Sequence, residues 1–168
     1  MQVYDTVRTV LAVRQFQDRS VSPQVVRKIV ESAWLTGSSM NRQPWNFIVV
    51  EDREVLIQLG AIAKTGPYIA QAAFAVVVVI ADSVGAISDA SRAIQSMVLT
   101  AWSEGVGSNW VGFHGMLEGV KPLLAIPPEL AVLAIIPFGY PVKVIGLGKK
   151  KRKPFGEVVH RDQFGKPF

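Results

Sequence analysis

The spacing of apolar residues changes several times along the chain, and each change predicts a switch between helix and strand. Apolar positions three and four residues apart predict helices at 3–12, after Ser22-Pro23, at 54–63, from Ser88-Asp89 to about Glu104, and at 116–124. Continuous runs rich in β-branched residues predict buried strands at 46–50, 74–80 and 130–138, and a short strand is also predicted at 157–160. Helices therefore separate most of the strands.

Apolar strands separated by helices are typical of an α+β sheet that is covered by helices. The 168 residues contain no internal repeat and are long enough to bury one core. A single domain over residues 1–168 is therefore expected.

Apolar residues are in surplus, at 49% of the chain against 18% charged. Such a surplus suggests that a subunit interface or a cofactor covers part of the surface. The predicted long helix carries a wide apolar stripe from Ile94 to Trp102, which suits both the core and a two-fold interface. A homodimer is therefore expected.

Composition also argues against some sites and locations. The chain has no cysteine, and His114 and His160 are far apart, so no metal site is expected and both histidines are interpreted as structural. The longest apolar run, near 72–81, is shorter than the ~20 residues of a membrane helix. The first residues lack a signal-peptide pattern. We therefore expect no membrane partner and a cytoplasmic location.

The net charge of +5 is concentrated in one place, because Lys149–Lys153 carries five positive charges. A solvated tail or a nucleic-acid contact is one interpretation of such a run. A ligand that bears a phosphate is the other.

A polar loop at 38–45 links a predicted helix to a predicted strand. Gly37, Ser38, Ser39 and Asn41 offer small polar groups and backbone N–H donors that suit an anion, although an ordinary polar turn has the same composition. Pro44 excludes a helix and favours an extended Gln43.

Five segments, taken in order, resemble the FMN-dependent nitroreductase family. They are Ala12–Phe16 (the family has R-R-S-V-R-x-F), Ser38–Phe47 (P-S-x-x-N-x-Q-P-W-x-F), Gly105–Gly112 (G-L-G-S-C-W-x-G), Ile135–Pro141 (I-x-P-L-G-Y-P) and Arg152–Pro154 (R-x-P). The chain departs from this pattern at Gly37, where the family usually has proline. It also has Val10, Leu11 and Ala12 where the family often has two arginines and a serine, so Arg8 could compensate.

The resemblance implies a nitroreductase-like fold, with a central, mainly antiparallel sheet flanked by helices. It also implies a domain-swapped type of homodimer with FMN near the interface. Residues 145–168 would then form a basic C-terminal arm that completes the FMN site.

The resemblance further implies which residues hold the cofactor. A phosphate dianion needs cations and N–H donors from separate segments. The implied cofactor-binding residues are Arg14, Ser38, Ser39, Asn41, Gln43, Trp110, Val111, Gly112, Lys150 and Arg152. A side chain at position 112 would obstruct close approach to the flavin. Met40 and Tyr68 are placed on the substrate side.

The implied activity is an FMN-dependent oxidoreductase. NADH or NADPH would reduce the flavin at N5, and a small acceptor such as a nitroaromatic or a quinone would then be reduced in a ping-pong cycle, with no catalytic side chain needed. Alternatives are reductive dehalogenation or flavin fragmentation on the same fold, and a flavin-binding protein without turnover. A nucleic-acid binder is disfavoured, because only Phe155 accompanies the basic run.

Overall fold

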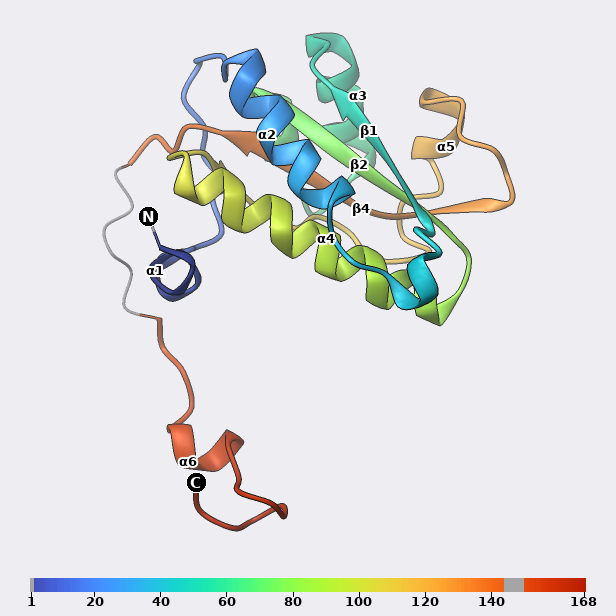
Figure 1. The fold of residues 1–168 in the computed structure, drawn as a ribbon. Coiled ribbons are helices and arrows are strands. Elements are labelled where there is room, and N and C mark those ends of the chain that lie inside the picture. The colour runs from blue at the N-terminus through green and yellow to red at the C-terminus, as the bar shows by residue number, and fades with distance from the viewer. Residues whose placement is uncertain (1, 144–149) are drawn as a thin grey trace.

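A four-stranded antiparallel sheet forms the centre of the computed structural model, which describes residues 2–143 and 150–168 (Figure 1). The elements in chain order are α1 (Val3–Thr9), α2 (Pro23–Trp34), η1 (Ser39–Asn41), β1 (Trp45–Val50), α3 (Arg53–Ile62), η2 (Pro67–Gln71), β2 (Phe74–Ala81), α4 (Val84–Ser103), β3 (Gly107–Ser108), α5 (Val120–Leu123), β4 (Leu130–Gly139) and α6 (Phe155–Val158). The strand order is β1-β2-β4-β3, and all three pairings are antiparallel. The predicted α+β architecture is confirmed.

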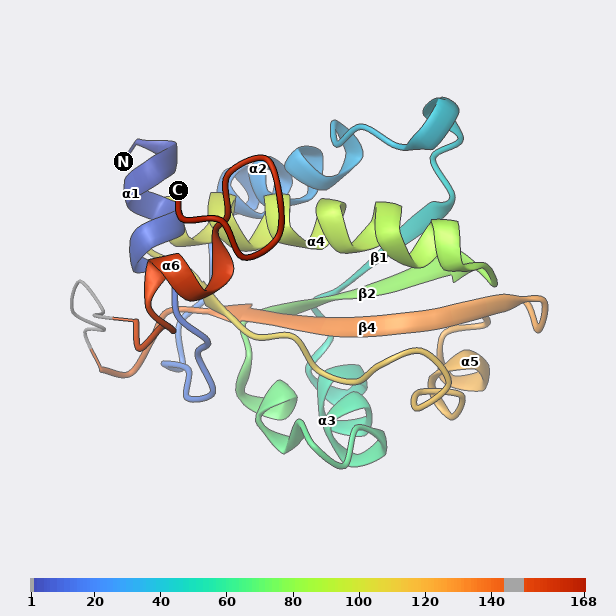
Figure 2. The ribbon, with the colours of Figure 1, turned by 90° about the horizontal axis from the view of Figure 1, so that it is seen from below.

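The helices cover both faces of the sheet. Figure 2 shows α2 and α4 on one face, with α3 and α5 on the other. Alternate residues of β2 serve the two cores, since Val76 and Val78 belong to the cluster under α2 and α4, while Val77 and Val79 belong to the cluster under α3 and α5. The strand is therefore buried on both sides, and this explains its unbroken apolar sequence.

Helix capping explains one success and one error of the sequence predictions. Ser22 caps α2 by accepting a hydrogen bond from Val25 N at 3.4 Å, as predicted. However, α4 begins at Val84, because Ser83 Oγ accepts from Ala86 N at 3.2 Å. The predicted start at Ser88-Asp89 is therefore wrong.

Three shorter elements also differ from expectation. The helix α1 ends at Thr9, because the backbone turns extended at Val10. The helix predicted over 116–124 contracts to the single turn α5. The strand predicted at 157–160 is wrong, since Pro154 leads into the helical turn α6 instead.

The segment after α1 lies along the end of the sheet that carries β3. Val13 N donates to Ser108 O at 2.9 Å, and Gln17 N donates to Tyr140 O at 2.8 Å. Gly107 in β3 permits this approach, because a Cβ there would lie 2.8 Å from Val13 Cβ. The N-terminal segment is thereby placed beside the end of α4.

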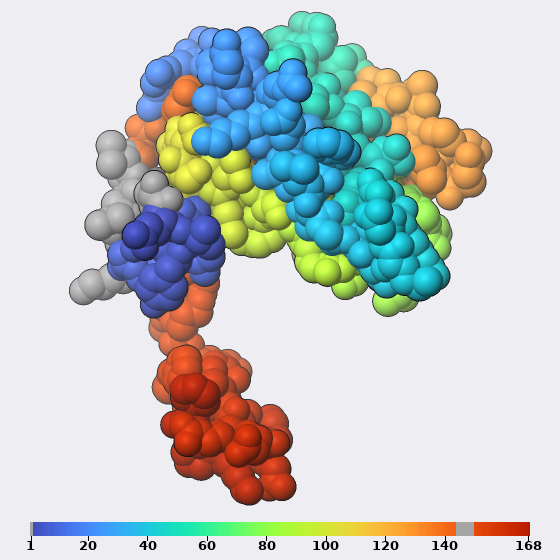
Figure 3. Space-filling model, viewed as in Figure 1, coloured from blue at the N-terminus to red at the C-terminus, as the bar shows by residue number. Residues whose placement is uncertain are grey.

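The C-terminal residues 150–168 project from the rest of the chain as an arm (Figures 1 and 3). Residues 145–149 of the predicted arm lie outside the described residues. The arm folds on itself through an edge-to-face contact of Phe155 with Phe168 at 5.8 Å. Much of its apolar surface stays uncovered, and Phe164 is 94% exposed.

The close approach at Gly107 generates a prediction. Gly107→Ala should lower the free energy of unfolding by about 1–3 kcal/mol, because the added methyl group overlaps the Val13 side chain. Gly85→Ala is the control, since nothing lies within 4 Å of its added Cβ and alanine is the better helix former. Urea unfolding checks both variants, and equal stability of the two would contradict the packing described here.

Candidate functional site

The first group of predicted binding residues lines a cavity of about 340 Å³ between the N-terminal segment, α4 and the chain after β3. The predicted residues among its walls are Trp110, Lys150 and Arg152. Other walls come from Val10, Leu11, Ala12, Ile94, Gln95, Val98, Ser108 and Asn109. The structure thus brings the basic arm and the Trp110 segment together, although 38 residues or more separate them in sequence.

Two cations reach this cavity without an acidic partner. Within residues 2–143 and 150–168, neither Lys150 nor Arg152 forms an ion pair with a carboxylate. Lys150 Nζ instead donates to the carbonyl oxygen of Val7 at 2.5 Å. Partial burial, and secondarily the charge of Arg152, lower the pKa of Lys150. A bound anion would relieve that repulsion, so the donor set fits a phosphate group.

Arg14 lies on the other side of the N-terminal segment. It lines a second cavity, of about 360 Å³, together with Lys143 and Pro141, and Ala12 lines both cavities. Arg14 therefore lies next to the first cavity but does not line it. Arg8 pairs with Asp5 at 3.5 Å on α1 and lines neither cavity.

The Trp110–Gly112 segment is held firmly by the sheet. Val111 is buried and exchanges two backbone hydrogen bonds with Ile135, each 3.0 Å long. Trp110 Nε1 donates to the carbonyl oxygen of Gly112 at 2.7 Å. Gly112 has a φ of +80°, and a Cβ there would lie 2.8 Å from Leu117 Cγ. Local backbone and packing already require glycine, independently of any ligand.

The second group of predicted residues forms the loop between α2 and β1. Ser38 Oγ accepts from Gln43 N at 2.9 Å, and Gln43 Nε2 donates to Asn41 Oδ1 at 3.1 Å. Met40, Asn41 and Gln43 have positive φ values of 52°, 54° and 49°. The extended conformation expected for Gln43 is therefore wrong, because the bond to Ser38 draws the backbone into a tight left-handed turn.

Asp89 is a site residue that the sequence did not reveal. Its carboxylate is buried, accepts the Ser39 N–H at 3.1 and 3.2 Å, and pairs with Arg92. The sequence suggested a helix cap at this position, and no local signal shows that a carboxylate in the second turn of α4 faces a loop fifty residues away.

The two groups lie at different parts of α4. Asp89 holds the 38–43 loop, whereas Ile94, Gln95 and Val98 line the first cavity, and Trp102 Nε1 donates to Thr9 Oγ1 at 3.0 Å. At a rise of 1.5 Å per residue, Asp89 lies about 7.5 Å along the helix from Ile94 and about 13.5 Å from Val98. Figures 1 and 2 show the loop and α1 at opposite ends of this helix. The first cavity has no residue of the 38–43 loop among its walls, so the two groups do not line it together within one chain.

The two predicted substrate-side residues are also separated, one in the 38–43 loop and one near the first cavity. Met40 is 80% exposed on the loop. Tyr68 accepts a hydrogen bond from the Asn109 side chain, behind the first cavity. His114, which the sequence analysis interpreted as structural, lies with its Nε2 2.8 Å from Asp82 Oδ1.

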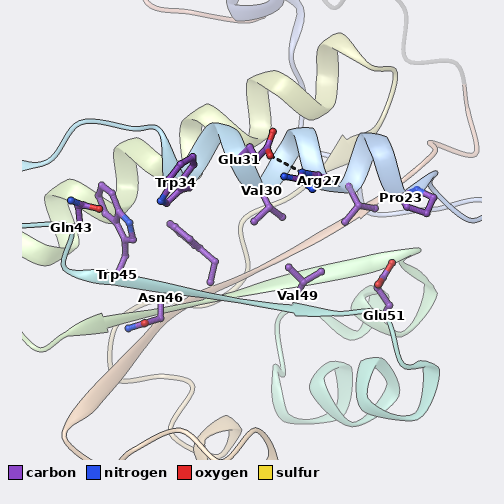
Figure 4. A pocket seen from close by; sticks show the side chains of 12 residues that line it. Pro23, Arg27, Val30, Glu31, Trp34, Gln43, Trp45, Asn46, Val49 and Glu51 are labelled. Atoms are coloured by element: carbon purple, nitrogen blue, oxygen red, sulfur yellow. Dashed lines mark hydrogen bonds and ion pairs between the residues drawn. The ribbon is translucent and has the colours of Figure 1, made fainter.

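A wide groove separates α2 from β1 and has a volume of about 750 Å³ (Figure 4). Trp34, Val30 and Val49 line it, and Gln43 closes the end near the loop. The Glu31 carboxylate accepts a hydrogen bond from Arg27 and raises the pKa of Arg27. In the described part of the sheet, β1 pairs only with β2, so its outer edge borders this groove unpaired.

The described residues hold neither a cluster of metal-ligating side chains nor a helix that could span a membrane. Among residues 2–143 and 150–168, no three His, Cys, Asp or Glu side chains gather as a metal site would require. None of the helices described has the length and apolar character to cross a membrane.

Comparison with known proteins identifies relatives over most of the chain. The family model described as "Nitroreductase family" matches residues 8–83 and 67–140. A protein of Methanothermobacter thermautotrophicus, provisionally named NADH dehydrogenase/NAD(P)H nitroreductase, is 32% identical over 151 residues, which are 85% of this chain and 79% of that protein.

Solved structures agree with this result. An FMN-dependent nitroreductase of Clostridium difficile superposes with a TM-score of 0.84 at 26% identity, covering 96% of this chain and 99% of that one. A provisionally named nitroreductase of Desulfovibrio desulfuricans, solved in complex with FMN, superposes with a TM-score of 0.84 at 26% identity, covering 98% of both chains.

Proposed function

Because the chain belongs to the nitroreductase family, we propose that it is an FMN-dependent oxidoreductase, and that it uses NADH or NADPH to reduce small acceptors such as nitroaromatics or quinones. The observation that carries this proposal is the pair of cations, Lys150 and Arg152, at a cavity walled by Trp110. Related proteins named as FMN-dependent or solved with FMN support the choice of cofactor.

Each part of the cavity has a role toward the cofactor. Lys150 and Arg152 would hold the phosphate, with Arg14 adding positive charge from the neighbouring cavity. The Trp110–Gly112 segment would support the ring system, because its hydrogen bonds to Ile135 keep it from shifting. FMN held there would supply the hydride chemistry between the reduced nicotinamide and the acceptor that a ping-pong cycle requires. The chain itself needs to supply position and charge rather than a nucleophile.

Cofactor identity and turnover can be tested together. The purified protein should be yellow, release FMN rather than FAD on denaturation, and oxidise NADH or NADPH faster when a quinone or a nitroaromatic is added. Chromatography of the released flavin and absorbance at the nicotinamide band are the measurements. A protein that retains only FAD, or that fails to bind added FMN, would refute the proposal.

The role of the arm can be tested by comparing two adjacent cations. Arg152→Ala should weaken FMN binding about 10- to 150-fold, because hydrogen bonds between charged groups contribute about 1.5–3 kcal/mol. Lys153→Ala is the matched control, since Lys153 is exposed and does not line the cavity. Flavin fluorescence titration gives both affinities, and excess FMN should restore turnover of Arg152→Ala. If both variants lose little FMN affinity, and by the same factor, the basic run is only a solvated tail.

We further infer that the active unit is a homodimer in which each site uses both groups of residues. The cavity and the 38–43 loop lie at different parts of α4, so the loop of one copy would complete the cavity of the other. The exposed apolar side chains of the arm, including Phe155 and Phe164, also need a partner surface. The groove beside the unpaired edge of β1 offers such a surface. Glu31 and Glu51, which line it, carry the charge opposite to that of the basic arm.

Heterodimers can test this composite site. Arg152→Ala changes the cavity group and Asn41→Ala the loop group, so co-expression with two tags can isolate dimers with one copy of each. If each site takes its two groups from different chains, one site carries both changes and the other carries none. Such dimers should then bind about half the wild-type amount of FMN tightly.

The opposite arrangement gives a different result. If both groups serve the site of their own chain, every site in the heterodimer carries one change, and FMN retention should stay at the level of the single variants. Light scattering provides a separate check, because a stable, flavin-loaded monomer would contradict the homodimer itself.

A further inference from the structure

The 38–43 loop has a conformation that its own sequence does not favour. Met40, Asn41 and Gln43 all have positive φ, and of these residue types only asparagine adopts that region readily. Most of the loop is exposed, so burial does not stabilise it. Hydrogen bonds of Gln43 to Ser38 and Asn41 hold part of this shape from within, and a contact with the rest of the chain is needed to fix where the loop lies.

Asp89 provides such an interaction from α4. Both carboxylate oxygens accept the Ser39 N–H, at 3.1 and 3.2 Å, and the residue is only 3% exposed. Arg92, one turn further along α4, pairs with the same carboxylate and compensates its charge. A buried carboxylate with two partners is a rigid acceptor.

This carboxylate does not cap its own helix. The helix α4 begins at Val84 and is capped by Ser83, so Asp89 lies in its second turn, where the backbone N–H groups are already bonded within the helix. The residue at which Asp89 acts is Ser39, fifty positions away. A separate bond, from Thr36 Oγ1 to Ser96 Oγ at 2.8 Å, ties the end of α2 to α4. Helix packing therefore does not depend on Asp89 alone.

We propose that Asp89 is a positioning residue for the flavin site. It holds Ser39, and through Ser39 the whole 38–43 loop, in the shape that faces the cofactor bound to the partner copy. The proposal rests on the proposed function and on the composite site. Asp89 itself contacts neither cofactor nor substrate, and it acts through the loop alone.

The test compares Asp89→Ala, Asp89→Asn and Asp52→Ala. Asp52 is a matched control, because its carboxylate also accepts a backbone N–H, from Val55 at 3.0 Å, but caps α3 away from both groups. FMN affinity of Asp89→Ala should fall about 10-fold or more, whereas Asp89→Asn keeps an acceptor oxygen and should retain most of it. Asp52→Ala should lose thermal stability without losing FMN affinity.

A second readout needs no flavin. Arg42 is exposed within the loop and offers a trypsin site in the flavin-free protein. Cleavage after Arg42 should be several times faster in Asp89→Ala than in the wild type or in Asp52→Ala, because a released loop samples the extended form that proteases bind.

If Asp89→Ala does not fold, Ser39 can be changed instead. Ser39→Pro removes the N–H that Asp89 accepts, and the extended Ser38 before it is compatible with proline. Ser39→Ala keeps the N–H and removes only the hydroxyl. Weaker FMN binding by Ser39→Pro than by Ser39→Ala is the expected result.

The outcomes separate two kinds of failure. A wild-type protein that does not bind FMN overturns the proposed function. A wild-type protein that binds FMN, together with Asp89→Ala or Ser39→Pro variants that bind it equally well and resist trypsin equally well, overturns the role of Asp89 alone.

Discussion

The burial of α4 against β2 and β4 fixes the surface against which the 38–43 loop and the first cavity are built. Its inner face, which includes Ala90, Ala93 and Met97, is buried in the core, and close packing there holds the helix in place. One part of α4 holds the 38–43 loop, and another part lines the cavity together with Lys150 and Arg152. The separation of the two groups is therefore a property of the core and not of flexible surface segments.

That separation links binding chemistry to assembly. A cation pair and an aromatic segment can hold one end of a large planar cofactor, but they leave the opposite side open to water. A second copy related by a two-fold axis can cover it without any change in the chain, since the loop that is remote in one copy can face the cavity of the other. The proposed dimer would also account for the apolar surplus of the sequence, because a chain that completed its site in a dimer would keep apolar surface for the interface.

The sequence was a good guide to the core and a weaker one to the site. The strands β2 and β4 were predicted almost to the residue, because burial on both faces leaves an unbroken apolar run. The start of α4 was misplaced, since Ser83 and Ser88 both have the chemistry of a cap and only packing decides between them. Asp89 could not be assigned at all, because its partner Ser39 is distant in sequence. The motifs suggested which residues matter, but spacing along the chain does not say at which end of a helix they will meet.

The N-terminal segment and the chain after β4 meet beside the two basic cavities, although Gln17 and Pro141 are 124 residues apart. Contacts between such distant segments form late, because most of the chain must be ordered before they can close. During synthesis, Val13 can bond to Ser108 once β3 has been made, but Gln17 has no partner until Tyr140 and Pro141, at the end of β4 and after it, have left the ribosome. We therefore expect the cavity that Lys150 and Arg152 line to close only after almost the whole chain has been made.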